Sequence, residues 1–281
     1  MMERNREGGR NGQGLEEKFR ALRCILGGLE NLVVLFSGGV DSTLLAHAAR
    51  RALGDRAVAL TLRSPLEDPA EAGTAVEAAC RIGIRHVVLQ SGDLEVPQIA
   101  GNHPDRCYAC RKHRDAKAWE WARRNGFSCV ADGLNRTDLG EDRPGRKASD
   151  EDGILHPLLD AGLSREEIRE LSRVEGLEGW ERAGSPCLAT RFPFGTGLSA
   201  EALSRVARAE AALRGLGFST VRVRSLPGPV AVVEVPDPGE AAARGPEILR
   251  LLQEAGFSGV LVDLEGYVRG RMSRPIPPAA P

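Results

Sequence analysis

Short, nearly continuous apolar runs alternate with helix-like segments over the first half of this 281-residue chain. Such runs are typical of parallel strands that are buried on both faces of a sheet. They span residues 32–36, 57–62, 86–89 and 128–131. The segments 43–53, 70–82 and 112–125 have the pattern of the connecting helices. We therefore expect an α/β domain with a doubly wound parallel sheet over residues 15–195.

After Gly195 the pattern changes to an α-β-β-α-β order. The expected helices are 200–213 and 246–255, and the expected strands are 220–224, 230–235 and 259–264. This order predicts a smaller α+β domain of residues 196–274. The flanking segments 1–14 and 275–281 have too few apolar groups to pack, so we expect them to be disordered.

Two shorter segments predict a loop and the start of a helix. The charged stretch 141–152 has no apolar periodicity and is predicted to be an exposed loop, either passive or a lid over a site. Ser164 and Glu167 have the spacing of a capping box and predict the start of another helix.

The composition describes an ordinary globular protein, with 42% hydrophobic residues, 27% charged residues and a formal net charge of -1. This charge gives no indication of a nucleic-acid partner. No run approaches the roughly 18 apolar residues that cross a membrane, and the N-terminus lacks the apolar centre of a signal peptide. We therefore expect a cytoplasmic protein with no membrane partner. Its six cysteines are too sparse for a disulfide scaffold and favour metal or thiol chemistry.

A glycine pair stands between the first predicted strand and its helix, in the sequence Ser37-Gly38-Gly39-Val40-Asp41-Ser42. Backbone N–H groups and the positive end of a helix converge at such a turn and bind anions. The loop has no lysine of the kind that holds a transferring γ-phosphate in the GxxxxGK[ST] loop. We therefore expect it to bind the pyrophosphate of ATP, which leaves the α-phosphorus open to attack by a carboxylate. A plain strand-to-helix turn is the alternative.

Three residues of this loop have expected roles beyond the backbone. Asp41 is the predicted holder of Mg²⁺, because carboxylate oxygens are ligands that this cation prefers. Ser37 and Ser42 are predicted to supply hydroxyl groups to the phosphates.

Two cysteines are spaced for a metal. Cys107 and Cys110 form a CxxC, whose thiolates can reach one metal from a single turn. Cys187 follows a proline in a polar segment beside Arg191, which favours a thiolate, so it is either a third ligand or a reactive thiol. The remaining cysteines are interpreted as small core residues. They are Cys24, Cys80 and Cys129.

The nature of the metal stays open at this point. Three thiolates would leave one iron of a [4Fe–4S] cluster free to bind a sulfur, whereas His113 or His103 as a fourth ligand would close a structural zinc site. A CxxC without metal is a further alternative, and a thioredoxin-like dithiol is less favoured because the motif does not follow the first strand.

Several motifs together resemble those of the LarE-type, ATP-dependent sulfur transferases, which are relatives of pyrophosphate-loop ATPases such as NAD synthetase, GMP synthetase and tRNA thiolases. Besides the glycine loop they are Asp105-Arg106-Cys107-Tyr108, Asp132-Gly133-Leu134-Asn135, Pro157-Leu158-Leu159, Ser185-Pro186-Cys187-Leu188-Ala189-Thr190-Arg191 and Asp263-Leu264-Glu265-Gly266-Tyr267. The resemblance covers almost the whole chain between the two terminal segments. It departs from the family's usual pattern at Leu134, His156 and Thr190.

The resemblance implies an adenine nucleotide α-hydrolase-like fold and a role in making the nickel-pincer nucleotide. The carboxylates of a pyridinium dicarboxylate mononucleotide would be adenylated, with release of pyrophosphate, and then converted to thiocarboxylates. In one version of the family's chemistry the cysteine at the position of Cys187 gives up its own sulfur and becomes dehydroalanine. In the other, three cysteines hold a [4Fe–4S] cluster that passes on a sulfide. Because Cys107, Cys110 and Cys187 are all present, we favour the cluster-dependent version.

The resemblance also implies roles for individual residues and a homo-oligomer, often a hexamer. As our own hypothesis for ATP binding, adenine would lie near residues 60–63, which include Leu62, and near Gly133, with Arg191 near the α-phosphate. The second domain would lend charged residues to the substrate, because a guanidinium makes two parallel hydrogen bonds to a phosphate or a carboxylate. The candidates, which are otherwise ordinary solvated charges, are Arg222, Arg224, Glu234, Asp263, Arg269 and Arg271.

Three other functions are consistent with parts of the sequence. An ammonia-dependent amide ligase would form the same adenylate without needing a cysteine. A tRNA thiolase is less favoured because no basic RNA-binding stretch is present. A non-catalytic module that senses ATP would leave Cys107, Cys110 and Cys187 unexplained.

Overall fold

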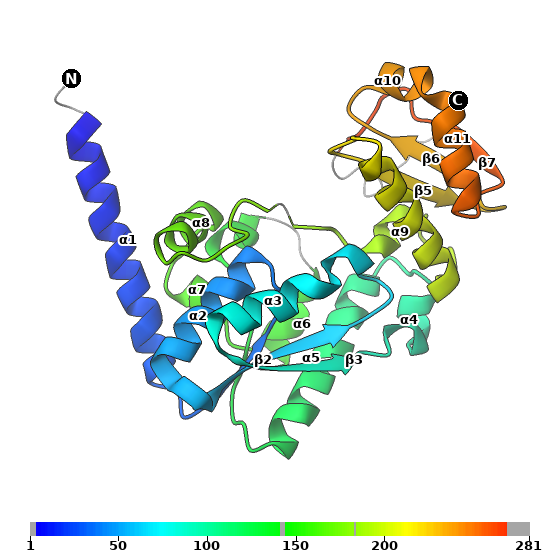
Figure 1. Cartoon of the computed structure of the whole chain (residues 1–281). Coiled ribbons are helices and arrows are strands. Elements are labelled where there is room, and N and C mark those ends of the chain that lie inside the picture. The colour runs from blue at the N-terminus through cyan, green and yellow to red at the C-terminus, as the bar shows by residue number, and fades with distance from the viewer. Residues whose placement is uncertain (1–3, 141–143, 183, 269–281) are drawn as a thin grey trace, which may run out of the picture. The chain divides into compact units, whose positions relative to one another are not determined.

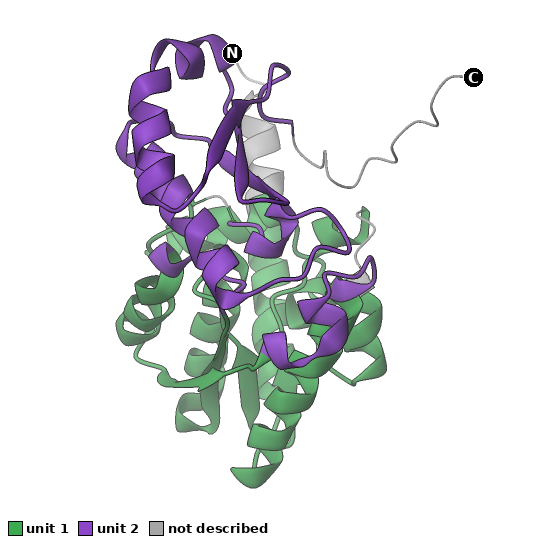
Figure 2. Ribbon diagram, turned by 90° about the vertical axis from the view of Figure 1, so that its right-hand side faces the viewer, with its two compact units in different colours: residues 1–64, 71–92, 107–184 green, residues 65–70, 93–106, 185–281 purple. Residues whose placement is uncertain are grey.

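The computed structural model describes residues 4–140, 144–182 and 184–268 (Figure 1), and for residues 4–13 and Pro144 it describes the backbone alone. The chain divides into two compact units (Figure 2). Unit 1 consists of residues 1–64, 71–92 and 107–184, and unit 2 of residues 65–70, 93–106 and 185–281. The units part at residue 184, earlier than the predicted boundary at 195, and unit 2 includes two segments from the first half of the chain.

Unit 1 is built on a parallel four-stranded sheet, as predicted, with the order β3-β2-β1-β4. Its strands are β1 (Leu32–Leu35), β2 (Ala57–Arg63), β3 (Arg85–Gln90) and β4 (Val130–Ala131). Leu32 pairs with Ala57 on one side of β1, and Val33 pairs with Val130 on the other. The strand order therefore reverses between β1 and β4. Ligands of open α/β sheets bind at such a point, outside the carboxyl ends of the strands.

Helices cover both faces of this sheet. They are α1 (Arg4–Gly27), α2 (Val40–Leu53), α3 (Ala72–Ile82), α5 (Arg106–Arg124), α6 (Pro144–Glu151), α7 (Pro157–Asp160) and α8 (Arg165–Val174). Ser164 and Glu167 form the predicted capping box at the start of α8.

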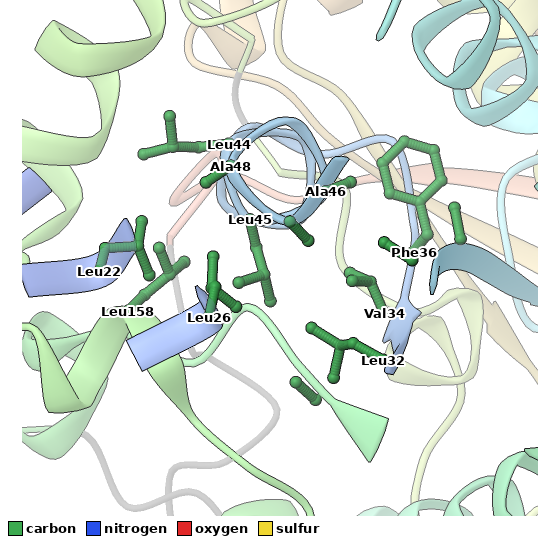
Figure 3. Close-up of a cluster of buried hydrophobic side chains, with 14 of the residues drawn as sticks. Leu22, Leu26, Leu32, Val34, Phe36, Leu44, Leu45, Ala46, Ala48 and Leu158 are labelled. Atoms are coloured by element: carbon green, nitrogen blue, oxygen red, sulfur yellow. The ribbon is translucent and has the colours of Figure 1, made fainter. Parts of the chain in front are cut away.

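The alternation of side chains along β1 explains its nearly continuous apolar sequence. Leu32 and Val34 pack in one core with Leu22 and Leu26 of α1 and with the apolar face of α2 (Figure 3). Val33, on the opposite face, packs in a second core with Ala118 and Ala122 of α5. Each fully buried leucine or valine contributes about 2 kcal/mol by leaving water, so burial on both faces holds the sheet between its helices.

Unit 2 has a separate three-stranded sheet with the order β5-β6-β7. The α-β-β-α-β order is as predicted, with one additional short helix before the last long one. The elements are α4 (Pro97–Ala100), α9 (Ala200–Gly215), β5 (Arg222–Leu226), β6 (Val230–Glu234), α10 (Pro238–Ala243), α11 (Gly245–Glu254) and β7 (Gly259–Val262). Strands β5 and β6 are antiparallel, whereas β6 and β7 are parallel.

Some expectations need correction. Residues 144–151 form α6 rather than a loop, and the helix buries Ala148 and Ser149, which are too small or too polar to produce an apolar pattern. Cys24 and Cys80 are exposed on the surfaces of their helices and Cys129 is half-buried. The interpretation of these cysteines as core residues was therefore wrong for the first two.

The terminal segments are not tested. Side chains of residues 1–13 and all of residues 275–281 lie outside the described part of the chain, so disorder there stays a prediction. Within the described ranges, no helix combines the length and apolar character that a membrane crossing requires.

Candidate active site

The glycine loop joins the end of β1 to the start of α2, as predicted. Gly38 has φ +76°, and a Cβ atom there would lie 2.7 Å from the backbone of Ala75 in α3. Only glycine combines this conformation with such a close approach. The loop is therefore fixed against the first turn of α3, with its remaining backbone available to an anion at the start of α2.

Both serines of the loop bond within it. Ser42 Oγ donates to the carbonyl of Gly39 at 3.1 Å and lies 3.3 Å from the backbone nitrogen of Ser37, which donates to it. Ser37 Oγ accepts from the Gly39 N–H at 3.2 Å and lies 3.2 Å from Ser42 Oγ. These contacts hold the loop in a single shape. Contact of the hydroxyl groups with phosphates, which we expected, stays a prediction.

A second glycine contacts the same helix start from the neighbouring strand. Gly133 follows β4, and a Cβ atom there would lie 3.0 Å from Ser42 N and 3.2 Å from Asp41 Cβ. Asp41 lies in the first turn of α2. Leu62 lies at the carboxyl end of β2 and is buried, with 7% of its surface exposed. The predicted loop, Mg²⁺ and adenine residues of unit 1 therefore lie at the carboxyl ends of β1, β2 and β4.

Sequence reasoning did not assign a role to the charged residues that lie beside the carboxyl ends of these strands. Asp132, directly after β4, accepts from Arg111 Nη2 at 2.7 Å and contacts His156 Nδ1 at 2.7 Å. Burial alone would raise the pKa of Asp132, but the bond from His156 and the charge of Arg111 bring it below its ordinary value. Arg111 also pairs with Asp115 at 2.8 Å, and burial raises the pKa of that carboxyl. The position of Asp132 at a strand end was the signal that could have indicated this cluster.

The CxxC lies in the first turns of α5. Cys107 is exposed and Cys110 is half-buried, and residues three apart lie on the same side of a helix. His113 Nε2 lies 2.7 Å from the carbonyl of Ser91, which engages one ring nitrogen of this candidate ligand. Among the described residues no three His, Cys, Asp or Glu side chains gather as a metal site. The two candidate ligands Cys107 and Cys110 are thus neighbours in unit 1, whereas Cys187 belongs to unit 2.

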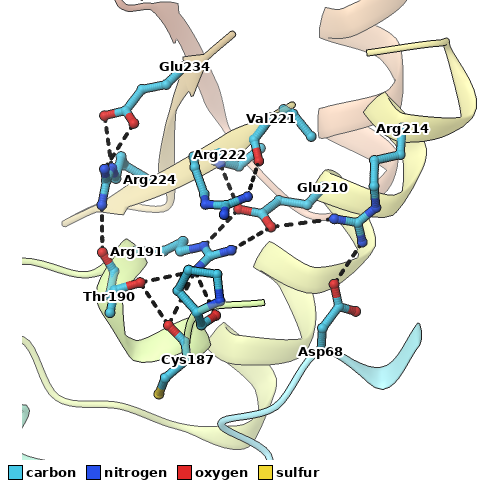
Figure 4. A network of polar contacts seen from close by, with 12 residues as sticks. Asp68, Cys187, Thr190, Arg191, Glu210, Arg214, Val221, Arg222, Arg224 and Glu234 are labelled. Carbon is cyan, nitrogen blue, oxygen red and sulfur yellow. Dashed lines mark hydrogen bonds and ion pairs between the residues drawn. The ribbon is translucent and has the colours of Figure 1, made fainter. Parts of the chain in front are cut away.

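Guanidinium groups hold the backbone around Cys187. Arg191 Nη1 donates to the carbonyls of Pro186 and Cys187 at 2.9 and 3.2 Å (Figure 4). Arg224 Nη1 donates to the carbonyl of Thr190 at 2.6 Å. The Cys187 side chain is exposed on this braced segment. A thiol on a fixed backbone is suited to meet a substrate in a reproducible position.

Arg191 is itself held by Glu210 of α9. Its Nε and Nη2 atoms donate to the two carboxylate oxygens at 2.8 and 2.9 Å, and the residues are 1% and 0% exposed. Glu210 also accepts from the backbone of Val223 in β5 at 3.0 Å. Arg191 therefore joins α9 and β5 to the Cys187 segment, a role that our prediction of an α-phosphate contact did not include. That contact stays a prediction.

The other predicted substrate residues differ in their surroundings. Arg224 and Glu234 form a buried pair with two bonds of 2.8 and 2.9 Å. Arg222 is half-buried, lies 5.5 Å from the ring centre of Tyr267 and donates to the carbonyl of Val221. Burial and the nearby charge of Arg191 lower its pKa, and the charge of Glu210 offsets this only in part. Asp263 follows β7 and accepts from Glu265 N, whereas Arg269 and Arg271 lie outside the described residues.

Replacing Gly38 tests the shape of the loop. We expect Gly38→Ala to weaken binding of inorganic pyrophosphate about tenfold or more, because the new Cβ atom displaces the loop from α3. Isothermal titration calorimetry measures this affinity. Gly54→Ala is the matched control, because Gly54 has a similar φ of +62° but open space around it. Equal affinities of the two variants would contradict this account of the loop.

Replacing Glu210 tests the support of the Cys187 segment. We expect Glu210→Ala to lower the free energy of unfolding by about 3 kcal/mol or more, because Arg191 is left buried without its carboxylate. Glu254→Ala removes an exposed partner of Arg250 and should cost less than about 1 kcal/mol. Urea denaturation followed by circular dichroism measures the free energy of unfolding of both variants. Similar losses of this free energy would contradict the structural role that we assign to the Arg191–Glu210 pair.

Comparisons with known proteins agree with this geometry. The asparagine synthase family matches residues 21–112, which include the glycine loop. Pyridinium-3,5-bisthiocarboxylic acid mononucleotide synthase of Lactiplantibacillus plantarum is 34% identical over 92% of this chain and 95% of its own length. An uncharacterized protein of Synechocystis is 38% identical over 92% of this chain and 98% of its own length. An uncharacterized protein of Methanocaldococcus jannaschii is 27% identical over 90% of this chain and 94% of its own length.

The glycine loop at the strand-order reversal, the exposed cysteine on its braced segment and a 34% identical synthase over nearly the full length lead to one assignment. The chain belongs to the LarE-type family of the pyrophosphate-loop ATPases and is an ATP-dependent enzyme that forms AMP and pyrophosphate.

Proposed function

We propose that the protein adenylates the carboxylates of a pyridinium dicarboxylate mononucleotide and converts them to thiocarboxylates for the nickel-pincer cofactor. The observation that carries this proposal is the exposed Cys187 on a segment braced by buried arginines, in a chain that also has a complete pyrophosphate loop. An amide ligase would have no use for such a thiol. The name of the Lactiplantibacillus relative supports the choice of substrate.

In the first step the loop of residues 37–42 binds the β- and γ-phosphates of ATP through backbone N–H groups at the start of α2. Asp41 would hold Mg²⁺, for which a carboxylate at this position is suited, and Leu62 and Gly133 would border the adenine. A substrate carboxylate oxygen attacks the α-phosphorus, the bond to the β-phosphate oxygen breaks, and pyrophosphate leaves. The product is an acyl-adenylate.

In the second step sulfur replaces oxygen. In the sacrificial route, the Cys187 thiolate attacks the adenylated carbonyl and AMP leaves, which forms a thioester. Loss of the Cα proton of Cys187 and cleavage of its Cβ–Sγ bond then release the thiocarboxylate and leave dehydroalanine in the chain. No external reductant is needed.

The sequence favours the cluster-dependent route, in which Cys107, Cys110 and Cys187 would hold a [4Fe–4S] cluster that supplies sulfide. The pair on α5 is suited to two of the three iron ligands, because both sulfurs lie on one side of the helix and neither residue is fully buried. In this route Cys187 remains intact after turnover.

Arg222 is the proposed anchor for the substrate phosphate, since Arg224 is already paired with Glu234. Asp263, Arg269 and Arg271 are further candidates at the same end of the chain. We also propose that the enzyme acts in the cytoplasm as a homo-oligomer, with a small-molecule nucleotide as its substrate and without nucleic acid.

Replacing Cys187 separates activation from sulfur transfer. We expect Cys187→Ala with Mg-ATP and the dicarboxylate nucleotide to release pyrophosphate, because the loop in unit 1 is intact, but to form no thiocarboxylate. A coupled pyrophosphate assay and mass spectrometry of the nucleotide measure the two products. Cys24→Ala, which removes another exposed thiol, should retain both activities.

The intact mass of the wild-type protein after turnover distinguishes the sulfur sources. Loss of the mass of one H₂S establishes the sacrificial route, whereas an unchanged mass together with iron and sulfide in anaerobically purified protein establishes the cluster. Thiocarboxylate formed by Cys187→Ala would exclude both routes. Amide formed from ammonia by that variant would favour the amide ligase.

A further inference from the structure

His156 lies between two carboxylates in unit 1. Its residue is 8% exposed, its Nδ1 atom lies 2.7 Å from Asp132 Oδ1, and its Nε2 atom lies 3.0 Å from Asp150 Oδ1. An ionised carboxylate only accepts hydrogen bonds, so a ring that bonds both must carry a proton on each nitrogen. The geometry therefore corresponds to an imidazolium ion.

The two carboxylates come from different elements. Asp132 follows β4 and lies next to Gly133, which contacts the start of α2, whereas Asp150 belongs to α6. His156 thus ties α6 to the strand end beside the glycine loop. This tie joins elements of unit 1 only.

Helix α6 also lies against the turn of α5 that carries the cysteine pair. A Cβ atom on Gly145 would lie 3.9 Å from the carbonyl oxygen of Cys107 and 3.7 Å from Arg111 Cβ. Ser149 Oγ donates to Asp115 at 3.3 Å. The exposed contact of Glu151 with Tyr108 adds little to the stability of this docking.

We propose that His156 is a pH-sensitive latch: as an imidazolium it fastens α6 to the end of β4 and against the cysteine turn, and its deprotonation releases α6. A neutral ring can donate to only one of the two carboxylates, and the other contact then sets a nitrogen lone pair against a carboxylate oxygen. This inference goes beyond the proposed function, since it depends on no substrate.

The charges around the ring agree with this assignment. Those that face it or its partners are Asp132 after β4, Asp150 and Arg146 of α6, and Arg111 and Asp115 of α5. Burial lowers the pKa of His156, but the bonds and charges of Asp132 and Asp150 more than offset this, so the pKa lies above its ordinary value of 6.5. A group with a raised pKa stabilises the folded form below its ordinary pKa, and this contribution is lost as pH rises through the folded value. The latch therefore opens as pH rises through this raised pKa.

Hydrogen exchange of the full chain, measured by mass spectrometry from mildly acidic to alkaline pH, tests the latch. After correction for the intrinsic pH dependence, we expect wild-type peptides of α6 to exchange about tenfold faster above the pKa of His156 than below it. His156→Gln should exchange fast throughout, because its amide cannot carry the charge. His156→Arg should stay protected throughout, because a guanidinium remains charged and can donate to two carboxylates.

His47→Gln is the matched control, because His47 contacts a single carboxylate, Glu175, and should leave α6 exchange unchanged. Titration of the His156 ring by nuclear magnetic resonance gives a readout that needs no variant. A ring that is neutral at neutral pH while α6 is protected, or wild-type exchange of α6 without pH dependence, would overturn the proposal.

Discussion

Two close backbone approaches hold the phosphate loop in shape, and the rest of unit 1 serves to maintain them. Gly38 rests against the first turn of α3, and Gly133 rests against the first turn of α2. These glycines follow neighbouring strands, β1 and β4, which meet where the strand order of the sheet reverses. A side chain at either position would push apart elements that must stay together. The buried cores on both faces of β1 supply the rigidity that keeps this edge from opening.

Unit 2 holds the exposed thiol of Cys187 on a fixed backbone. The segment around Cys187 has a single short 3₁₀ turn, Leu188–Arg191, so some of its carbonyls take side chains as hydrogen-bond partners. Arg191 and Arg224 provide them, and Glu210 and Glu234 hold these arginines in turn. A carboxylate balances the charge of each buried guanidinium, which offsets the cost of removing that charge from water. The chemistry we propose needs this fixed backbone, since the acyl-adenylate must react with sulfur before it reacts with water.

Much of this could be predicted from the sequence, because local patterns carry the information. Strands β1 and β2 are apolar on both faces, and the glycine loop and capping box are short-range signals. Helix α6 was missed because it buries alanine and serine instead of a large apolar stripe. The role of Arg191 was missed because its partner Glu210 lies on another helix, and no sequence pattern joins the two. The same holds for His156, whose carboxylates flank it only once β4 and α6 are folded.

The central claim is that ATP activates a substrate carboxylate by transfer of the adenylyl group. A substrate with ¹⁸O in its carboxylates tests this most directly, because the oxygen that attacks the α-phosphorus leaves with AMP when sulfur takes its place. The account predicts that each AMP released carries one ¹⁸O atom, as measured by mass spectrometry. AMP without label, formed together with thiocarboxylate, would contradict it.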